Sequence, residues 1–207
     1  MARVSIITPW LNASELVRTY KPSVRGAEVI IIDNGSEAHH AAVIRGMVEE
    51  LEGTYIRNEY NSGFSAANNQ GLAVATGEIV VFLNNDVECA DGWLLSVQRD
   101  TQPGELAGPS MLSKHGVNYL EGYCIAARRQ TWDALGGWPD NLPGMYWEDN
   151  ILCLQAIQAG IKLRQTGWSV WHFNNYTSRN VPGAYAHSGA NEQYFMEMVN
   201  AYHHSRK

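Results

Sequence analysis

Two amides and a carboxylate, Asn84, Asn85 and Asp86, directly follow a run of apolar residues in the stretch EIVVFLNNDVE. Hard divalent cations prefer oxygen ligands, and a carboxylate at the end of a strand can supply one without burying an unpaired charge. The amides cannot be anionic ligands, but they can form hydrogen bonds with ribose or sugar hydroxyls. Because Asn and Asp are also common after strands, this stretch alone is weak evidence for a metal site.

A second acidic pair, Glu148 and Asp149, opens a stretch with helical periodicity. Acidic residues in a first helical turn are favoured by the helix dipole and by capping, so the pair has an ordinary structural explanation. Three aromatic residues lie in the preceding loop: Trp138, Tyr146 and Trp147. They could be core residues, but aromatic rings also stack on the apolar faces of sugars.

Polar residues also stand at the ends of the other predicted strands. The first strand ends at Thr8, Pro9 and Trp10, the second ends at Asp33, and the third is followed by Asn61, Gly63 and Asn68. Taken singly, each group could be turn chemistry. Because the carboxyl ends of parallel strands lie along one edge of a sheet, four such ends together predict a ligand-binding crevice. Asp33 stands where doubly wound folds often use a carboxylate to accept hydrogen bonds from a nucleotide.

The elements that must position these residues alternate between strands and helices. The pattern predicts strands at 4–8, 28–33, 54–58 and 78–84, and helices at 37–52 and 64–75. This alternation predicts an α/β fold, Rossmann-like, with a doubly wound, mostly parallel sheet flanked by helices.

The second half of the chain is more broken. We expect helices at 91–100, with Asp91 as N-cap, and at 148–160, a single strand followed by a short helix from 118 onward, and strand-like pieces at 161–165 and 169–173. There are no internal repeats and no clear linker, so we expect one domain over residues 1–175. For the polar tail 176–207 the pattern indicates no definite structure, and we expect it to pack on the same domain.

The composition is that of a globular protein, with 207 residues, 45% hydrophobic residues, 17% charged residues and a net charge of −6. Scattered basic residues argue against a nucleic-acid partner. No apolar run approaches the length of a membrane span, and no signal-peptide pattern opens the chain. Cys89, Cys124 and Cys153 lack metal-ligand spacing and predict free thiols. We therefore expect a cytoplasmic protein without a transmembrane segment.

The loop after the first strand, PWLNAS, is not rich in glycine. It lacks both the GxGxxG pattern and the P-loop lysine, which argues against a dinucleotide dehydrogenase and a P-loop phosphotransferase. A diphosphate ligand would then need another source of positive charge, for which a divalent metal ion is the obvious candidate.

The ordered segments resemble a family 2 glycosyltransferase with the GT-A fold, and most closely its rhamnosyl- and galactofuranosyl-transferase-like branch. The resemblance rests on VSIITPWLN, VIIIDNGS, NSGFSAANNQGL, VVFLNNDVE, GYCIAARRQTWDALGGWPDNL, and MYWEDNILCLQAIQAGIKL closing with WHF. One segment would be weak evidence, but the set occurs in the order of the family and covers residues 3–173. The tail falls outside it.

The resemblance implies a metal-assisted, inverting transfer of one sugar from a nucleotide-diphosphate-sugar donor, UDP- or dTDP-linked, to a hydroxyl acceptor such as a glycan. The base and ribose would be held by Thr8, Pro9, Trp10 and Asp33. Residues near the nucleotide and the diphosphate would be Asn61, Gly63 and Asn68.

Asn84-Asn85-Asp86 occupies the position of the Asp-x-Asp motif of the family, which implies that Asp86 binds Mn²⁺ or Mg²⁺. The first acidic position is Asn here, which weakens any role for two carboxylates on one metal. His172 matches a histidine that completes the metal site in some relatives, although it could equally be a core or surface histidine. An imidazole ligand would shift the preference from Mg²⁺ towards Mn²⁺.

Glu148 and Asp149 match the acidic pair of the family, which implies that Asp149 is the general base and removes the proton from the acceptor hydroxyl. Glu148 either orients the acceptor or is itself the base. We expect the helix N-terminus to keep this carboxylate ionised at neutral pH. Because their loop adjoins this pair, we assign Trp138, Tyr146 and Trp147 to the acceptor site.

Two other functions remain open on the sequence. A sugar-nucleotide nucleotidyltransferase shares a similar core and needs metal, but it usually carries a glycine-rich, basic loop after the first strand. A non-catalytic module that binds a nucleotide-sugar or glycan would not need the retained Asp86, Glu148 and Asp149. The sugar, the acceptor and the oligomeric state are not determined by the sequence.

Overall fold

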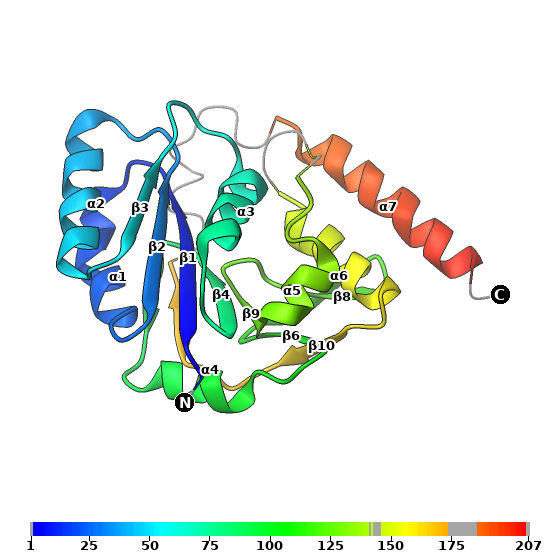
Figure 1. The fold of residues 1–207 in the computed structure, drawn as a ribbon. Helices are drawn as coiled ribbons and strands as arrows, with labels where there is room; N and C mark the ends of the chain where they lie inside the picture. The colour runs from blue at the N-terminus through cyan, green and yellow to red at the C-terminus, as the bar shows by residue number, and fades with distance from the viewer. Residues whose placement is uncertain (1, 141, 143–145, 174–185, 206–207) are drawn as a thin grey trace.

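A computed structural model describes residues 2–140, 142, 146–173 and 186–205. A seven-stranded sheet with the order β10-β6-β9-β4-β1-β2-β3 runs through the centre (Figure 1). Its strands are β1 (Val4–Trp10), β2 (Glu28–Asp33), β3 (Thr54–Arg57), β4 (Ile79–Leu83), β6 (Glu105–Gly108), β9 (Cys124–Arg128) and β10 (Lys162–Gln165). Two small sheets pair β5 (Val87–Cys89) with β11 (Val170–His172), and β7 (Met111–Lys114) with β8 (Val117–Leu120).

The strand directions confirm the predicted mostly parallel α/β fold. β1 is parallel to β2 and β4, and β2 is parallel to β3. β9 is antiparallel to both of its neighbours, β4 and β6, and β10 is parallel to β6.

Helices cover both faces of the sheet. They are α1 (Val17–Ser23, preceded by the 3₁₀ turn η1, Ser14–Leu16), α2 (Ala38–Glu50), α3 (Phe64–Val74), α4 (Trp93–Asp100), α5 (Arg129–Leu135), α6 (Glu148–Gln158) and α7 (Ser188–His204). Alternate strand residues point to opposite faces, so Ile31 packs in the core under α1, α2 and α4, whereas Ile30 packs under α3, α5 and α6. Burial on both faces explains why β2 and β4 are continuous apolar runs rather than alternating ones.

Two predictions for the second half are wrong. The single strand expected from 118 is two strands, because the chain turns at Glu121–Tyr123, where the Cys124 amide donates to the Glu121 carbonyl. The N-cap of α4 is Gly92 and not Asp91, since the chain enters this helix with φ 76°, a left-handed conformation that favours glycine.

The tail contains one long helix that the sequence pattern did not predict. α7 packs on α6 and β8 through a small apolar cluster that includes Phe195, Val199, Ile151 and Val117. Figure 1 shows α7 extending away from the sheet, on the side of α6 and β8. None of the helices in the described part of the chain combines the length and the apolar character needed to cross a lipid bilayer.

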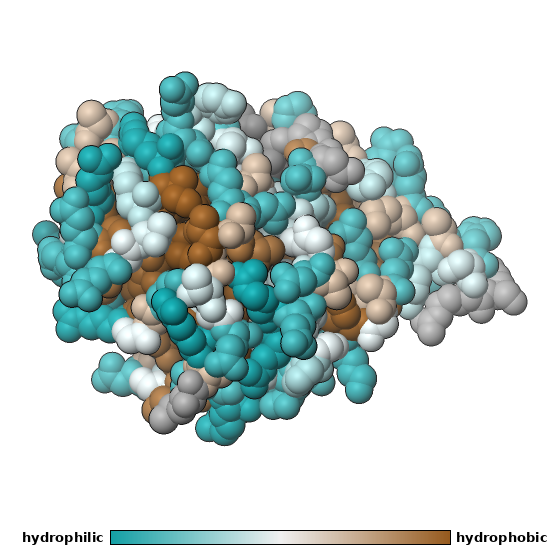
Figure 2. Space-filling view, viewed as in Figure 1, coloured by the Kyte–Doolittle hydropathy of each residue, from teal (hydrophilic) through white to brown (hydrophobic). Residues whose placement is uncertain are grey.

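Polar side chains cover most of the face seen in Figure 2, with apolar surface gathered over the central strands. Cys89, Cys124 and Cys153 are free thiols, as predicted, and Cys124 and Cys153 are buried.

Candidate active site

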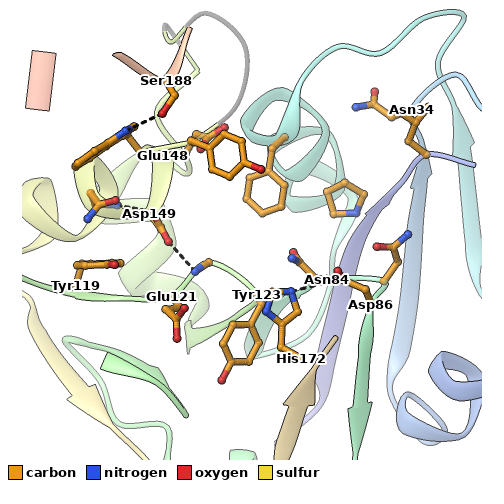
Figure 3. Close-up of a pocket in the computed structure, with 18 of the residues that line it drawn as sticks. Asn34, Asn84, Asp86, Tyr119, Glu121, Tyr123, Glu148, Asp149, His172 and Ser188 are labelled. Atoms are coloured by element: carbon orange, nitrogen blue, oxygen red, sulfur yellow. Dashed lines mark hydrogen bonds and ion pairs between the residues drawn. The ribbon is translucent and has the colours of Figure 1, made fainter. Parts of the chain in front are cut away.

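A pocket of about 480 Å³ lies at the carboxyl ends of β1, β2 and β4 and faces the start of α6. It brings Asp86, after β4, and Asp149, in the first turn of α6, into one cavity (Figure 3). The predicted site residues that line it are Pro9, Trp10, Asn61, Asn84, Asn85, Asp86, Tyr146, Trp147, Glu148, Asp149 and His172. Residues far apart in the sequence thus share one cavity.

Five predicted site residues do not line this pocket: Thr8, Asp33, Gly63, Asn68 and Trp138. The hydroxyl of Thr8 is buried and lies 2.5 Å from the Tyr20 hydroxyl. The Trp138 ring lies edge-on to Phe82 in the core, with 5.5 Å between ring centroids. Because the side chains of Thr8 and Trp138 are buried in the core, they would have to move to contact a ligand directly.

Asp33 is fully buried and supports the turn after β2. Its carboxylate accepts hydrogen bonds from the Ser36 amide at 2.8 Å, from the Tyr55 hydroxyl and from the Arg57 guanidinium. Burial by itself would raise the pKa of Asp33, but these donors together hold it below its usual range. Asp33 therefore shapes the turn that presents Asn34, which does line the pocket.

The start of α3 forms another part of this edge. Gly63 is the N-cap of α3, with φ 89°, and its carbonyl accepts a hydrogen bond of 3.2 Å from the side-chain Nδ2 of Asn34. Asn68 lies in the first half of α3 and is fully buried. Neither polar atom of the Asn68 amide has a hydrogen-bond partner among the residues described.

Asp86 and His172 form the candidate metal centre. The His172 Nε2 atom lies 3.1 Å from Asp86 Oδ1, and both side chains are largely buried. Antiparallel pairing of β11 with β5 brings them together, and the Phe173 amide donates to the Asp86 carbonyl at 2.8 Å. The Tyr123 ring stacks on the imidazole, with 4.5 Å between centroids and 15° between planes.

A carboxylate oxygen and an imidazole nitrogen 3.1 Å apart are suitable ligands for one divalent cation such as Mn²⁺. Across the described ranges, no cluster of three or more His, Cys, Asp or Glu side chains suited to a metal is found.

The carboxylate of Asp149 is held in place by two backbone donors. The Gly122 amide donates to Oδ2 at 3.0 Å, and the Asn150 amide donates to Oδ1 at 2.9 Å (Figure 3). Burial raises the pKa of Asp149 to about 6 despite these donors, and burial raises that of Glu148 to about 7. With this pKa Asp149 is mostly ionised at neutral pH, as predicted, although burial outweighs the backbone donors that lower the pKa.

The backbone just before this pair is strained. Tyr146 has φ 78° and Trp147 has φ 77°, a left-handed conformation that costs about 1–2 kcal/mol for each non-glycine residue. Such a conformation persists only where surrounding contacts hold it. It turns the chain so that α6 begins with Glu148 and Asp149 in the pocket wall.

Burial of Glu148 predicts a pH-dependent stability. A glutamate with a raised folded-state pKa binds more protons when folded, so its contribution to stability falls as pH rises from about 4.5 to about 7. Glu148→Gln should therefore raise the free energy of unfolding at pH 8 by on the order of 1–3 kcal/mol, and much less at pH 5. Urea unfolding at the two pH values measures this, and an equal effect at both would contradict it.

Several lining residues were missed by sequence reasoning. They are Leu11, Asn34, Phe64, Lys114, Tyr119, Glu121, Gly122, Tyr123, Asn150 and Ser188. Asn34 belongs to the polar stretch that marked the end of β2, so a signal for it existed. Glu121, Gly122 and Tyr123 could not be found, because the turn that carries them was predicted as part of a strand.

Gly122 lies so close to Asp149 that a larger residue at this position would displace the Asp149 carboxylate. A Cβ atom at Gly122 would come within 3.3 Å of Asp149 Cβ and 3.5 Å of Oδ2. Gly122→Ala should therefore displace this side chain by a few tenths of an ångström and lower turnover about 10- to 100-fold. Steady-state kinetics check this, with Gly167→Ala as the control, because no atom lies within 4 Å of a Cβ there. Equal rates for the two variants would contradict it.

The profile of glycosyl transferase family 2 matches residues 5–108 of the sequence. The chain belongs to glycosyl transferase family 2. Among curated relatives, the pre-mycofactocin glycosyltransferase of Mycobacterium tuberculosis is 26% identical over 194 residues, which cover 78% of this chain and 40% of that protein. This glycosyltransferase family 2 chain therefore spans less than half the length of that relative.

Solved structures of glycosyltransferases share its GT-A fold. The mannosyltransferase PcManGT from Pyrobaculum calidifontis, in complex with GDP-Man and Mn²⁺, matches 80% of this chain and 55% of its own, with a TM-score of 0.67 and 20% identity. GalNAc-T7, with UDP, GalNAc and Mn²⁺, matches 83% of this chain and 44% of its own, with a TM-score of 0.70 and 18% identity. At these identities the likeness establishes the fold alone.

Proposed function

We propose that this family 2 domain transfers one sugar from a nucleotide-diphosphate-sugar donor to a hydroxyl acceptor, with inversion at the anomeric carbon. One observation carries the proposal. Asp86 and Asp149, from opposite halves of the sequence, line the same pocket at the carboxyl ends of the parallel strands. A displacement needs a stabilised leaving group and a base, and this cavity offers residues for both.

In this proposal the donor lies along the ends of β1, β2 and β4. Pro9, Trp10, Asn34 and Asn61 surround the nucleotide. Asp33 contributes indirectly, through the turn that presents Asn34. Asn84 and Asn85 form hydrogen bonds with ribose or sugar hydroxyls.

Asp86 and His172 would hold the divalent cation, Mn²⁺ or Mg²⁺. When bound there, such a cation offsets the negative charge that develops on the departing diphosphate. The presence of Mn²⁺ in the PcManGT and GalNAc-T7 complexes supports a divalent cation as the cofactor. Tyr123, stacked on His172, keeps the imidazole turned towards Asp86.

Asp149 is the general base. Its two oxygens are oriented by the amides of Gly122 and Asn150, and its pKa of about 6 leaves it ionised yet basic enough to accept a proton near neutral pH. Glu148, with a pKa of about 7, holds a proton more readily and orients the acceptor. Because the acceptor oxygen attacks in one displacement, the anomeric configuration inverts.

Thermal unfolding with nucleotide diphosphates tests the proposal. We expect UDP, dTDP or GDP at about 100 times its Kd to stabilise the fold by about 2.7 kcal/mol, and only when Mn²⁺ or Mg²⁺ is present. For a chain of this size the melting temperature should rise by about 5–10 °C. Mn²⁺ alone and the nucleotide without metal are the controls. No metal-dependent response to any of the three diphosphates would reject the proposal.

A further inference from the structure

We infer that α7 is a positioning element of this site. It holds Tyr146 and Trp147 in the conformation that places Glu148 and Asp149 in the pocket wall, and it shapes the acceptor end of the pocket. The part concerning the acceptor rests on the proposed function, whereas the restraint on the backbone does not. The family profile ends at residue 108, so α7 lies outside the part of the chain that it matches.

Two hydrogen bonds tie α7 to the strained dipeptide. The Asn191 Nδ2 group donates to the Tyr146 carbonyl at 3.1 Å. The Trp147 indole Nε1 donates to the Ser188 hydroxyl at 3.2 Å, as the dashed line at Ser188 in Figure 3 shows. Asn191 is almost completely buried, and Ser188 itself lines the pocket. The helix thus contacts both residues of this left-handed dipeptide, Tyr146 and Trp147.

The indole of Trp147 is also enclosed from other directions. The Phe195 ring of α7 lies 5.5 Å from it, and the His115 ring, at the turn of the β7–β8 hairpin, stacks at 6.0 Å. Lys114 places its ammonium group 4.9 Å from the ring centroid. His115 is itself held to α7, since its Nε2 atom lies 3.1 Å from Glu192 Oε1. Helix and hairpin together therefore fix one aromatic wall of the pocket.

The sequence of α7 fits this role. Ser188, Asn191, Phe195 and Val199 recur at steps of three and four, which places them on one face of the helix. The last three are buried against α6 and the loop before it, whereas Met196 on another face is 43% exposed. Polar residues that meet the dipeptide therefore occupy the same face as the apolar residues that anchor the helix.

The physical need for such a restraint follows from the backbone. A left-handed conformation at two consecutive aromatic residues is maintained only when the surroundings over-determine it. The Ile151 amide donates to the Trp147 carbonyl at 3.0 Å, so the first turn of α6 depends on the placement of Trp147. Loss of the α7 contacts should therefore loosen the start of α6, where Glu148 and Asp149 lie.

Hydrogen exchange of the intact chain tests the inference. In Asn191→Ala and in Ser188→Ala, amides in the peptide that spans 146–153 should exchange at least about fivefold faster, while those of β1 and β4 keep their rates. Ser188→Thr, which retains the hydroxyl, should restore slow exchange. Met196→Ala, on an exposed face of the same helix, is the matched control. Unchanged exchange at 146–153 in both alanine variants would overturn the inference, as would equal acceleration in Met196→Ala.

A second measurement separates this inference from the proposed function. The Mn²⁺-dependent rise in melting temperature with UDP, dTDP or GDP should be the same in Asn191→Ala as in the wild type, because the donor side is untouched. With a donor and an acceptor that support sugar transfer, Asn191→Ala should raise the KM for the acceptor about tenfold over the wild type and keep the KM for the donor within twofold. A wild type without any nucleotide response would reject the proposed function, and the exchange result would still decide the role of α7.

Discussion

Asp149→Asn should lower the rate of sugar transfer about 10³-fold, the loss expected when a positioned general base is removed. The amide has nearly the same shape and can still accept the hydrogen bond of 3.0 Å from the Gly122 amide. It cannot take a proton from the acceptor hydroxyl. Stopped assays of nucleotide diphosphate release, with saturating donor and acceptor, measure the change.

Three further results distinguish a lost base from a damaged site. The metal-dependent nucleotide response should persist in Asp149→Asn, and Asp91→Asn, an exposed position, should leave the rate unchanged. In the wild type, kcat/KM should rise with pH to a plateau, with the midpoint of the rise at about pH 6, because only the ionised carboxylate of Asp149 accepts a proton. A larger loss in Glu148→Gln than in Asp149→Asn would transfer the role of base to Glu148.

Asp86→Ala should abolish the metal-dependent part of nucleotide binding and lower transfer by about 10²- to 10³-fold or more. Asp86 is the carboxylate partner of His172, and its side chain is almost completely buried. Without the Asp86 carboxylate, the His172 imidazole is the remaining metal ligand of the pair. Calorimetric titration of UDP, dTDP and GDP, each with and without Mn²⁺, measures the loss directly.

The comparison with Asp91→Ala shows whether the effect is local, because Asp91 carries the same charge but is exposed. His172→Ala should give a smaller loss, with Mn²⁺ affinity reduced more than Mg²⁺ affinity, since nitrogen donors favour Mn²⁺. Metal-dependent binding that survives in Asp86→Ala would remove Asp86 from the metal centre and would overturn the assignment of this pocket.

The first half of the fold was predictable because its signals are local. The β-branched run of β2 and the turn residues that follow it depend on neighbours in the sequence, and the predicted range 28–33 agrees with the structure. The position of Asp86 at the end of a strand was also predictable, because a polar cluster directly after an apolar run marks the carboxyl end of a strand. The family resemblance extended this reasoning to Glu148 and Asp149.

Other features depend on contacts between distant segments, which no local pattern encodes. The family resemblance made His172 a candidate ligand, but it is the antiparallel pairing of β11 with β5 that places it 3.1 Å from Asp86. Burial in the assembled pocket raises the pKa of Asp149 by more than the backbone amides of Gly122 and Asn150 lower it. Gly122 contributes through a close approach across the turn between β8 and β9.

The sequence by itself determined the type of fold and the edge of the sheet that carries polar residues. These follow from periodicity and from residue order, which are properties of short segments. The tertiary structure alone decided that Asp33 and Trp138 do not line the pocket while Asn34 does, and that α7 reaches Tyr146 and Trp147. Which side chain faces a cavity depends on how separate elements pack, and that packing is fixed only when the whole chain has folded.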